Sequence, residues 1–301
     1  MKKIRESLGD RVFNAVNLTL ITLMMLIVLY PLIYIVSASI SDPDLVNTGK
    51  VWLWPRGITF EGYYRVFQDS SIMVGYRNTI FYTVAGTLIN LFFTLTAAYS
   101  LSKSDLPGRR FLMLFCTFTM YFGGGMIPSY LLMKNLHLLN TYWILLIGGA
   151  VSTTNLIISR TFFQNGVPKE IEEAAFIDGC SPIRAFSTIV IPLSKALIGV
   201  MALYYGVGHW NSYFSAMIYI TDRSKYPLQL ILREILIENQ MKADMMAAGA
   251  YVDELLLDAQ VKAASLIRYA VIIVSSLPVL IIYPFLQKYF DKGVMIGSIK
   301  G

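Results

Sequence analysis

The stretch VPKEIEEAAFIDGCSPIRAFSTIVIP (Val167–Pro192) lies between two long apolar segments and carries closely spaced helix start and stop signals. Pro168 suits the first turn of a helix, and the acidic residues after it favour the positive N-terminal end of that helix. Gly179 suits the left-handed conformation in which helices often end. We therefore expect a short helix of about ten residues, roughly 15 Å long.

A second short helix is expected directly after the glycine. Ser181 is a favourable N-cap and Pro182 a favourable first helical residue, and Pro192 marks the entry into the next apolar segment. In the first helix, Ala174 and Ala175 offer a low surface that allows close packing. A unit of helix, glycine and helix is too short to be a domain, and it suits docking onto another protein.

The composition around this stretch is that of a membrane protein. Hydrophobic residues make up 55% of the 301 residues and charged residues only 15%, a balance too apolar for an ordinary soluble domain. Six windows without Asp, Glu, Lys or Arg each hold the roughly 20 residues of a spanning helix. We expect an all-α integral membrane protein with six transmembrane helices, at about 16–40, 78–102, 111–128, 139–160, 196–220 and 266–287.

The basic residues between the windows predict the orientation, because cytoplasmic connections retain Lys and Arg. Residues 1–12 hold four of them and residues 102–110 hold three, whereas residues 128–141 hold only Lys134. Both termini are therefore expected in the cytoplasm, and so is the segment 164–195. The first window could instead be a signal peptide, but its 30 uncharged residues exceed an h-region of about 7 to 15.

The 167–192 stretch resembles a known motif. Glu173-Ala174-Ala175, then three residues, Gly179, nine more residues and Ile189-Val190-Ile191-Pro192 resemble the EAA loop of permease subunits of ATP-binding-cassette (ABC) importers. In that family the short helix docks into a cleft of the ATPase subunit. The resemblance implies that the EAA loop (residues 164–195) couples to an ATPase through the following residues: Glu173, Ala174, Ala175, Asp178, Gly179, Ile189 and Pro192.

Other stretches are similar to maltose-permease-type subunits of type I importers. These are His209-Trp210-Asn211, Tyr226–Gln229 and the ending from Lys292 to Gly301; Gly123–Pro128 and Tyr283–Phe290 resemble a subgroup assigned to complex oligosaccharides. The resemblance implies a cytoplasmic N-terminus (1–12), a transmembrane permease domain (13–291) and a cytoplasmic tail (292–301). In that tail, Gly297, Ser298 and Lys300 would contact the ATPase.

The resemblance also implies an assembly that takes up sugars, with oligosaccharides expected. Its parts would be a second homologous permease, two ABC ATPases and an extracytoplasmic sugar-binding protein in the bacterial cytoplasmic membrane. Since the chain lacks the phosphate-binding pattern G-x-x-x-x-G-K-S/T, we expect a separate subunit to hydrolyse ATP. In this chain we expect no catalytic residue and no bound cofactor or metal. ATP and Mg²⁺ would lie on the partner ATPase.

Candidates for sugar contact are the aromatic and amide side chains of the fifth segment, namely Tyr204, Tyr205, Trp210, Asn211 and Tyr213. Such side chains hold neutral, hydroxyl-rich ligands, although interfacial aromatic residues also anchor helices in bilayers. Both interpretations stay open at this point.

Three other classes compete with the importer hypothesis. The first is a secondary transporter or channel. Ion-driven transport generally needs ionisable groups within the membrane, and the windows hold none beyond His137 and His209, for which a packed or interfacial position is the plainer explanation. A membrane-embedded glycosyltransferase would use the Asp42-Pro43-Asp44 triplet as a metal site, although Asp and Pro also favour a simple turn. A non-transporting scaffold would use the 167–192 stretch for docking alone.

Overall fold

The protein was analysed as a computed structural model that describes residues 7–247 and 267–284. Within these ranges all regular secondary structure is helical. The chain divides into two compact units, residues 1–69 with 234–276, and residues 70–233 with 277–301.

The first unit begins with three helices, α1 (Leu8–Ser39), α2 (Pro43–Asn47) and α3 (Glu61–Gln68). A capping box between Ser7 and Asp10 starts α1. The side chains of α1 are exposed from Leu8 to Ile33, and most of them are apolar. A helix that is apolar on all sides belongs in a membrane or a protein core, so α1 is fitted to be surrounded by lipid or by other membrane helices.

The chain folds back over the end of α1. Ser37 Oγ donates a hydrogen bond to Leu53 O at 2.6 Å, and the backbone N–H of Asp42 donates to Arg56 O at 3.0 Å. Asp42 is the N-cap of α2, because its Oδ1 accepts a hydrogen bond of 2.8 Å from Asp44 N. The Asp42-Pro43-Asp44 triplet is thus a capped turn, and the described residues contain no cluster of His, Cys, Asp or Glu that could hold a metal ion.

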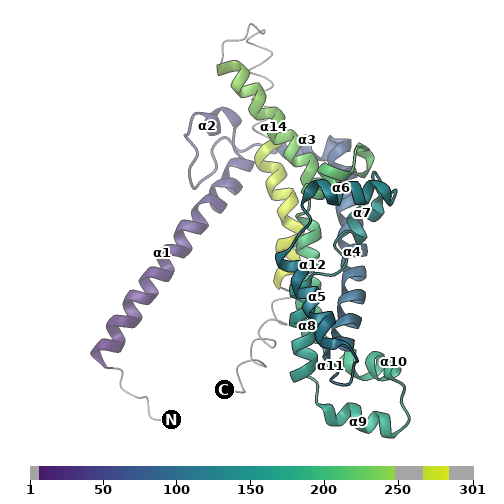
Figure 1. The fold of residues 1–301 in the computed structure, drawn as a ribbon. Coiled ribbons are helices and arrows are strands. Elements are labelled where there is room, and N and C mark those ends of the chain that lie inside the picture. Colours follow the sequence, from purple (N-terminus) through teal and green to yellow (C-terminus); the bar gives the residue numbers. More distant parts are fainter. Residues whose placement is uncertain (1–6, 248–266, 285–301) are drawn as a thin grey trace. The chain divides into compact units, whose positions relative to one another are not determined.

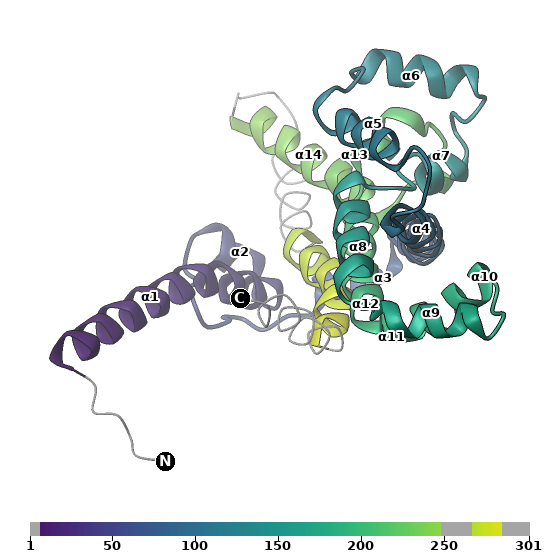
Figure 2. The same cartoon turned by 60° about the horizontal axis from the view of Figure 1, so that its bottom comes forward.

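The second unit is built on α4 (Ser70–Ser102), a helix of 33 residues and about 50 Å. It packs against α8 (Thr153–Asn165) and α12 (Lys195–Trp210), and Figure 2 views α4 nearly along its axis with both helices beside it. Leu95, Leu156 and Met201 join the three helices in one buried core. The remaining helices of this unit are α5 (Arg109–Tyr121), α6 (Met126–Asn135), α7 (Tyr142–Ile147), α9 (Lys169–Ile177), α10 (Pro182–Ala185), α11 (Ile191–Leu193) and α13 (Phe214–Tyr219). Helix α14 (Leu228–Ala247) runs from this unit into the first.

Three of the expected spans are interrupted. The helix expected at 111–128 ends at Tyr121, and α6 turns away from α5 by 117° after the glycines 123–125. The one expected at 139–160 is split into α7 and α8 by the non-helical residues 148–152, and the one expected at 196–220 breaks after Trp210. Glycine residues lower helix stability at the first two breaks. A search for uncharged windows does not detect such breaks, because glycine is uncharged.

Within residues 7–247 and 267–284, fewer than six helices could cross a membrane by length and composition. Among the described residues α1, α4 and the helix Ile267–Pro284 are long and apolar enough by themselves, and the number rises to five if each of two strongly bent helix pairs is one span. One bent pair is α5 with α6, and the other joins Pro182–Leu193 to α12 at 82°. The helix expected at 78–102 is α4, which starts earlier, at Ser70.

The two ends of α4 meet different parts of the second unit (Figure 1). Helices α9 and α10 lie at its C-terminal end, and α6 and α7 lie toward its N-terminal end. At the N-terminal end, Asn78 Nδ2 donates to the carbonyl oxygens of Ser224 and Tyr226, and Tyr82 Oη donates to Lys225 O at 2.8 Å. These contacts fix the short 3₁₀ turn Arg223–Lys225 (η2) against α4.

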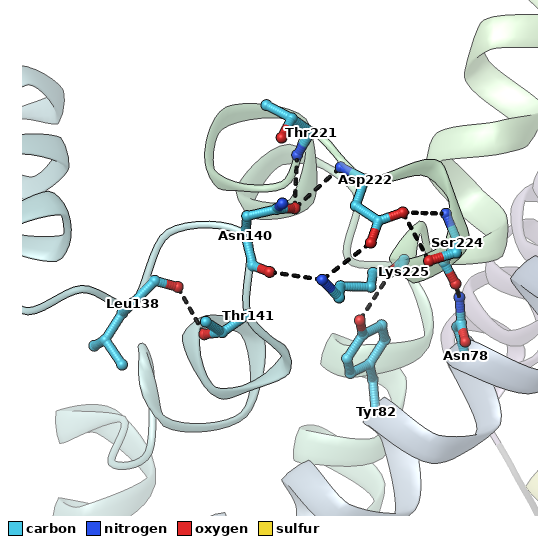
Figure 3. Close-up of polar contacts among 9 residues, drawn as sticks. All are labelled: Asn78, Tyr82, Leu138, Asn140, Thr141, Thr221, Asp222, Ser224 and Lys225. Atoms are coloured by element: carbon cyan, nitrogen blue, oxygen red, sulfur yellow. Dashed lines mark hydrogen bonds and ion pairs between the residues drawn. The ribbon is translucent and has the colours of Figure 1, made fainter.

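Asn140 is the centre of a polar clamp at this turn (Figure 3). Its Oδ1 accepts hydrogen bonds from the backbone N–H groups of Thr221 and Asp222 at 3.2 and 3.0 Å, and its carbonyl oxygen accepts one from Lys225 Nζ at 2.9 Å. Lys225 also pairs with Asp222 at 3.0 Å. Hydrogen bonds from Ser224 and Lys225 lower the pKa of Asp222 to about 2. Because that pKa is depressed, the carboxylate contribution to the clamp is complete above the ordinary pKa of Asp and disappears only as the pH falls toward 2.

We expect Asn140→Ala to lower the unfolding temperature of the purified protein by several degrees. The change removes an acceptor for two backbone N–H groups, at about 1–3 kcal/mol, and places alanine at a φ of +58°, where asparagine is better tolerated. Thermal unfolding in detergent measures the effect.

Asn140→Asp keeps the acceptor oxygen and Asn140→Gly keeps the tolerance of positive φ, so each should retain part of the stability. Equal unfolding temperatures for the parent protein and Asn140→Ala would contradict the importance of the clamp.

Candidate functional site

The EAA loop forms two short helices separated by a left-handed glycine. Helix α9 starts after Pro168, which is its N-cap rather than its first residue, and Gly179 has a φ of +77°. The N–H of Cys180 donates to Ala175 O at 2.9 Å and that of Gly179 to Phe176 O at 3.0 Å. This is the Schellman pattern of helix ends, and it confirms the predicted glycine stop.

The second helix starts as the sequence predicts and then continues differently. Ser181 Oγ accepts from Arg184 N at 3.4 Å, and Pro182 is the first residue of α10. A π-helical segment, Phe186–Val190 (η1), follows, so Ile189 lies in a π turn. Pro192 lies within α11, and the chain enters α12 only after Ser194.

Most of the α9 and Gly179 residues that are expected to couple to an ATPase are exposed to solvent. Glu173, Ala174, Asp178 and Gly179 are exposed, whereas Ala175 is buried at 9% exposure. Phe176 and Ile177 are 41% and 86% exposed. Helix α9 therefore presents small, acidic and apolar side chains to its surroundings, as a helix that docks into a partner would.

A polar cavity of about 520 Å³ lies further along the bundle, beside the break between α7 and α8. Its walls come from α4, α6, α7, α8, α12 and α13, and none of these lining residues of the described structure is Asp, Glu, Lys or Arg. They are Asn90, Ser129, Met133, Ile144, Leu145, Gly148, Gly149, Ser152, Asn155, Tyr204, Tyr205, Gly208, His209, Ser212, Ser215 and Tyr219.

Two side chains of α4 support the non-helical backbone at this cavity. Asn90, which is 1% exposed, donates from Nδ2 to the carbonyl oxygens of Gly149 and Ala150 at 2.9 and 2.8 Å. Thr94 Oγ1 lies 2.7 Å from Tyr205 Oη, and that oxygen accepts from the N–H of Ser152 at 3.1 Å. Irregular backbone at membrane depth is tolerated where it is buried or lines a cavity, and both conditions hold here.

His209 joins this network through its ring. Its Nε2 donates to Asn90 Oδ1 at 2.6 Å, and its imidazole lies directly against Gly86 of α4. The plainer expectation, a packed histidine, describes His209, which is half-buried and hydrogen-bonded. His137 lies in a turn with a φ of +57°, and its Nδ1 is 3.3 Å from Lys134 O.

No family model matches the chain, but comparisons with individual proteins identify its family. The chain is 40% identical over 296 residues to Protein LplC of Bacillus subtilis, which covers 97% of this chain and 96% of that protein. It is 39% identical over 295 residues to the polygalacturonan/rhamnogalacturonan transport system permease protein YtcP of the same organism, covering 97% and 99%. This chain belongs to the family of permease subunits of ABC sugar importers.

A solved structure agrees with this assignment. One chain in the crystal structure of a bacterial ABC transporter involved in the import of the acidic polysaccharide alginate superposes with a TM-score of 0.85. That chain is 36% identical in sequence, and the match covers 96% of this permease and 100% of that chain. The permease is thus a multi-pass membrane protein and a component of an ABC transporter.

Of the five residues expected to contact sugar, two line the polar cavity and three do not. Tyr204 and Tyr205 line the polar cavity. Trp210 is 6% exposed, packs edge-on against Tyr76 with ring centroids 5.9 Å apart, and lines an apolar cleft instead. Asn211 is the C-cap of α12, and its Nδ2 donates to Val207 O at 3.0 Å.

The last candidate, Tyr213, lies outside the cavity, with the Arg233 guanidinium 5.5 Å from its ring centroid. Sequence reasoning missed Asn90, Thr94 and Ser152, because single polar residues within apolar windows carry no distinctive pattern. The expected ATPase contacts Gly297, Ser298 and Lys300 lie outside the described residues.

We expect Gly86→Ala to lower both stability and uptake. A methyl group at this position would overlap the imidazole of His209, and overpacking of this kind costs about 1–3 kcal/mol. Displacement of His209 would also break its hydrogen bond with Asn90. Thermal unfolding in detergent and uptake in whole cells measure the two effects.

Gly206→Ala on α12 is the matched control, because the nearest side-chain atom to its new methyl group would be Thr87 Oγ1 at 3.7 Å, an ordinary contact. It should leave uptake intact and gain up to about 1 kcal/mol from helix propensity. If both variants showed the same unfolding temperature and the same uptake, the close approach of His209 to Gly86 would matter for neither stability nor transport.

Proposed function

We propose that this permease forms, with a second similar permease, the translocation pathway of an ATP-driven importer of oligosaccharides. Two ABC ATPases and an extracytoplasmic sugar-binding protein would complete the assembly in the bacterial cytoplasmic membrane. The observation that carries the proposal is the EAA loop, a Schellman-capped helix with an exposed Glu173-Ala174 surface at one end of the α4–α8–α12 bundle.

ATP and Mg²⁺ would be bound by the partner ATPases, and this chain would bind no cofactor of its own. Closure of the ATPases on nucleotide would bring the coupling helices of the two permeases together. That movement would open the shared pathway alternately to the two sides of the membrane.

The proposed orientation has six spans with both termini in the cytoplasm. It is supported by the basic residues at the α9 end of the bundle. Lys103, Arg109 and Arg110 follow α4, Arg184 lies in α10, and Lys195 is the first residue of α12. Cytoplasmic faces of membrane proteins are enriched in Lys and Arg. The clamp at Asn140 would then lie on the outer side, toward the sugar-binding protein.

The polar cavity supports a sugar as the transported molecule. Its wall combines amide, hydroxyl and tyrosine side chains, which form hydrogen bonds with sugar hydroxyl groups and stack on sugar rings. Two of the relatives above are named for acidic polymers, polygalacturonan/rhamnogalacturonan and alginate. A cavity wall free of carboxylates is compatible with such substrates, so uronate oligosaccharides are the first class to test.

Substitutions at Gly179 test the coupling function. Gly179→Val forces a β-branched residue into a left-handed conformation, whereas asparagine adopts that conformation more readily. We expect Gly179→Val to abolish uptake of uronate oligosaccharides by cells and Gly179→Asn to retain a substantial part of it. Both should reach the membrane, because the space around Gly179 is open and the helix bundle does not depend on it.

Co-purification from mild detergent distinguishes this proposal from its rivals. An ATPase subunit should co-purify with the parent protein and be lost or uncoupled in Gly179→Val. Uptake that persists after inactivation of every co-purifying ATPase would instead indicate an ion-driven transporter, and normal uptake without this chain would indicate a scaffold.

A further inference from the structure

An ion pair joins the EAA loop to the end of α4. Glu172 of α9 pairs with Lys103, the first residue after α4. Glu172 is only 8% exposed, whereas the next residue, Glu173, is exposed. Successive residues of a helix point about 100° apart, so the side chain of Glu172 is turned toward its own bundle while that of Glu173 stays exposed.

Lys103 is held firmly on its own side of the pair. Its Nζ lies 4.3 Å from the centroid of the Tyr99 ring, one turn back on α4. Its carbonyl oxygen accepts a hydrogen bond of 3.1 Å from Arg109 Nη1. Because both its side chain and its carbonyl group are held in this way, Lys103 is expected to move together with the end of α4 when Glu172 moves.

The end of α4 is in turn tied to α8. Arg160 Nε donates to Leu101 O at 2.9 Å, and Gln164 Nε2 donates to Ser102 O at 3.4 Å. These side chains satisfy carbonyl groups that a helix end leaves without intrahelical partners. A displacement of Lys103 is therefore a displacement of the α4 end as a whole.

A groove of about 890 Å³ lies between α9 and the turn that follows α4. Its walls include both residues of the ion pair, together with Asp105, Arg109 and Phe176. Close packing therefore does not fill the space between α9 and this turn. The Lys103–Glu172 ion pair is a charged contact that bridges this groove.

The middle of α4 lies at the polar cavity. Asn90 and Thr94 support the irregular backbone at 148–152 from this helix, and Asn90 lies about 20 Å from Lys103 at 1.5 Å per residue. One rigid helix thus connects the ion pair with the cavity wall.

We infer that the Lys103–Glu172 ion pair is the linkage through which movement of α9 reaches α4 and the wall of the polar cavity. The inference rests on the proposed function, since it assumes that an ATPase moves α9. Lys103 and Glu172 are positioning residues: they transmit the movement and contact neither nucleotide nor sugar.

The test uses the complete transporter in proteoliposomes and needs no knowledge of the sugar. Ser152→Cys, in a background with Cys116→Ser and Cys180→Ser, places one thiol at the cavity. The rate of its labelling by a small maleimide is measured without nucleotide and with ATP and vanadate, and ATP hydrolysis is measured in parallel.

In the parent transporter nucleotide should change the labelling rate several-fold. Lys103→Met and Glu172→Gln should each abolish most of this change while ATP hydrolysis persists within about threefold. The charge swap Lys103→Glu with Glu172→Lys should restore at least half of it, and Lys103→Arg should retain it.

Glu61→Gln is the matched control, because it breaks an exposed ion pair with Arg65 in the first unit and should leave the change intact. The inference is overturned if Lys103→Met and Glu172→Gln keep the full nucleotide-dependent change, or if Glu61→Gln abolishes it as well. It is also overturned if the charge swap and Lys103→Arg assemble with the ATPase yet show no change. If no ATPase co-purifies with the parent protein, the proposed function itself fails, which is a different result.

Discussion

The second unit depends on one constraint, that peptide groups without a helical partner must find another partner inside a membrane. Residues 148–152 interrupt the helix expected at 139–160, and three of their peptide groups form hydrogen bonds with the side chains of Asn90 and Tyr205. Because those partners come from α4 and α12, the break holds three helices in register around it. The same break lines part of the polar cavity, so the interruption of the helix also opens a polar space inside the bundle.

The permease uses α4 to connect features that lie far apart in the sequence. Its first turns carry the contacts with the 3₁₀ turn at 223–225, its middle carries Asn90 and Thr94, and its end meets the EAA loop through Lys103. Each of these contacts is polar and directional, whereas the packing against α8 and α12 between them is mainly apolar.

The sequence predicted the local features well, because short-range chemistry determines them. The stop at Gly179 and the cap at Ser181 follow from backbone preferences of single residues, and both are present in the structure. Charge counting identified a membrane protein, but it could not locate the break after Ile147, since a loop made of Gly, Ala and Val is as uncharged as a helix. The ion pair of Lys103 with Glu172 joins residues 69 positions apart, and no local pattern indicates such a partner. Trp210 was expected to contact sugar because it is aromatic; the structure places it in an apolar cleft, buried and edge-on against Tyr76.

The exposed part of α1 has a dimension that matters for the membrane around it. From residue 12 to residue 33 the helix is uncharged and exposed, a length of roughly 33 Å at 1.5 Å per residue. The hydrocarbon layer of a typical bilayer is about 30 Å thick, so this helix matches it with little hydrophobic mismatch. A thinner membrane would favour tilting or kinking of α1 or local thickening of the bilayer, and a thicker one would favour local thinning of the bilayer around it. Lipid chain length is therefore a variable to which this permease is physically sensitive, independently of nucleotide or sugar.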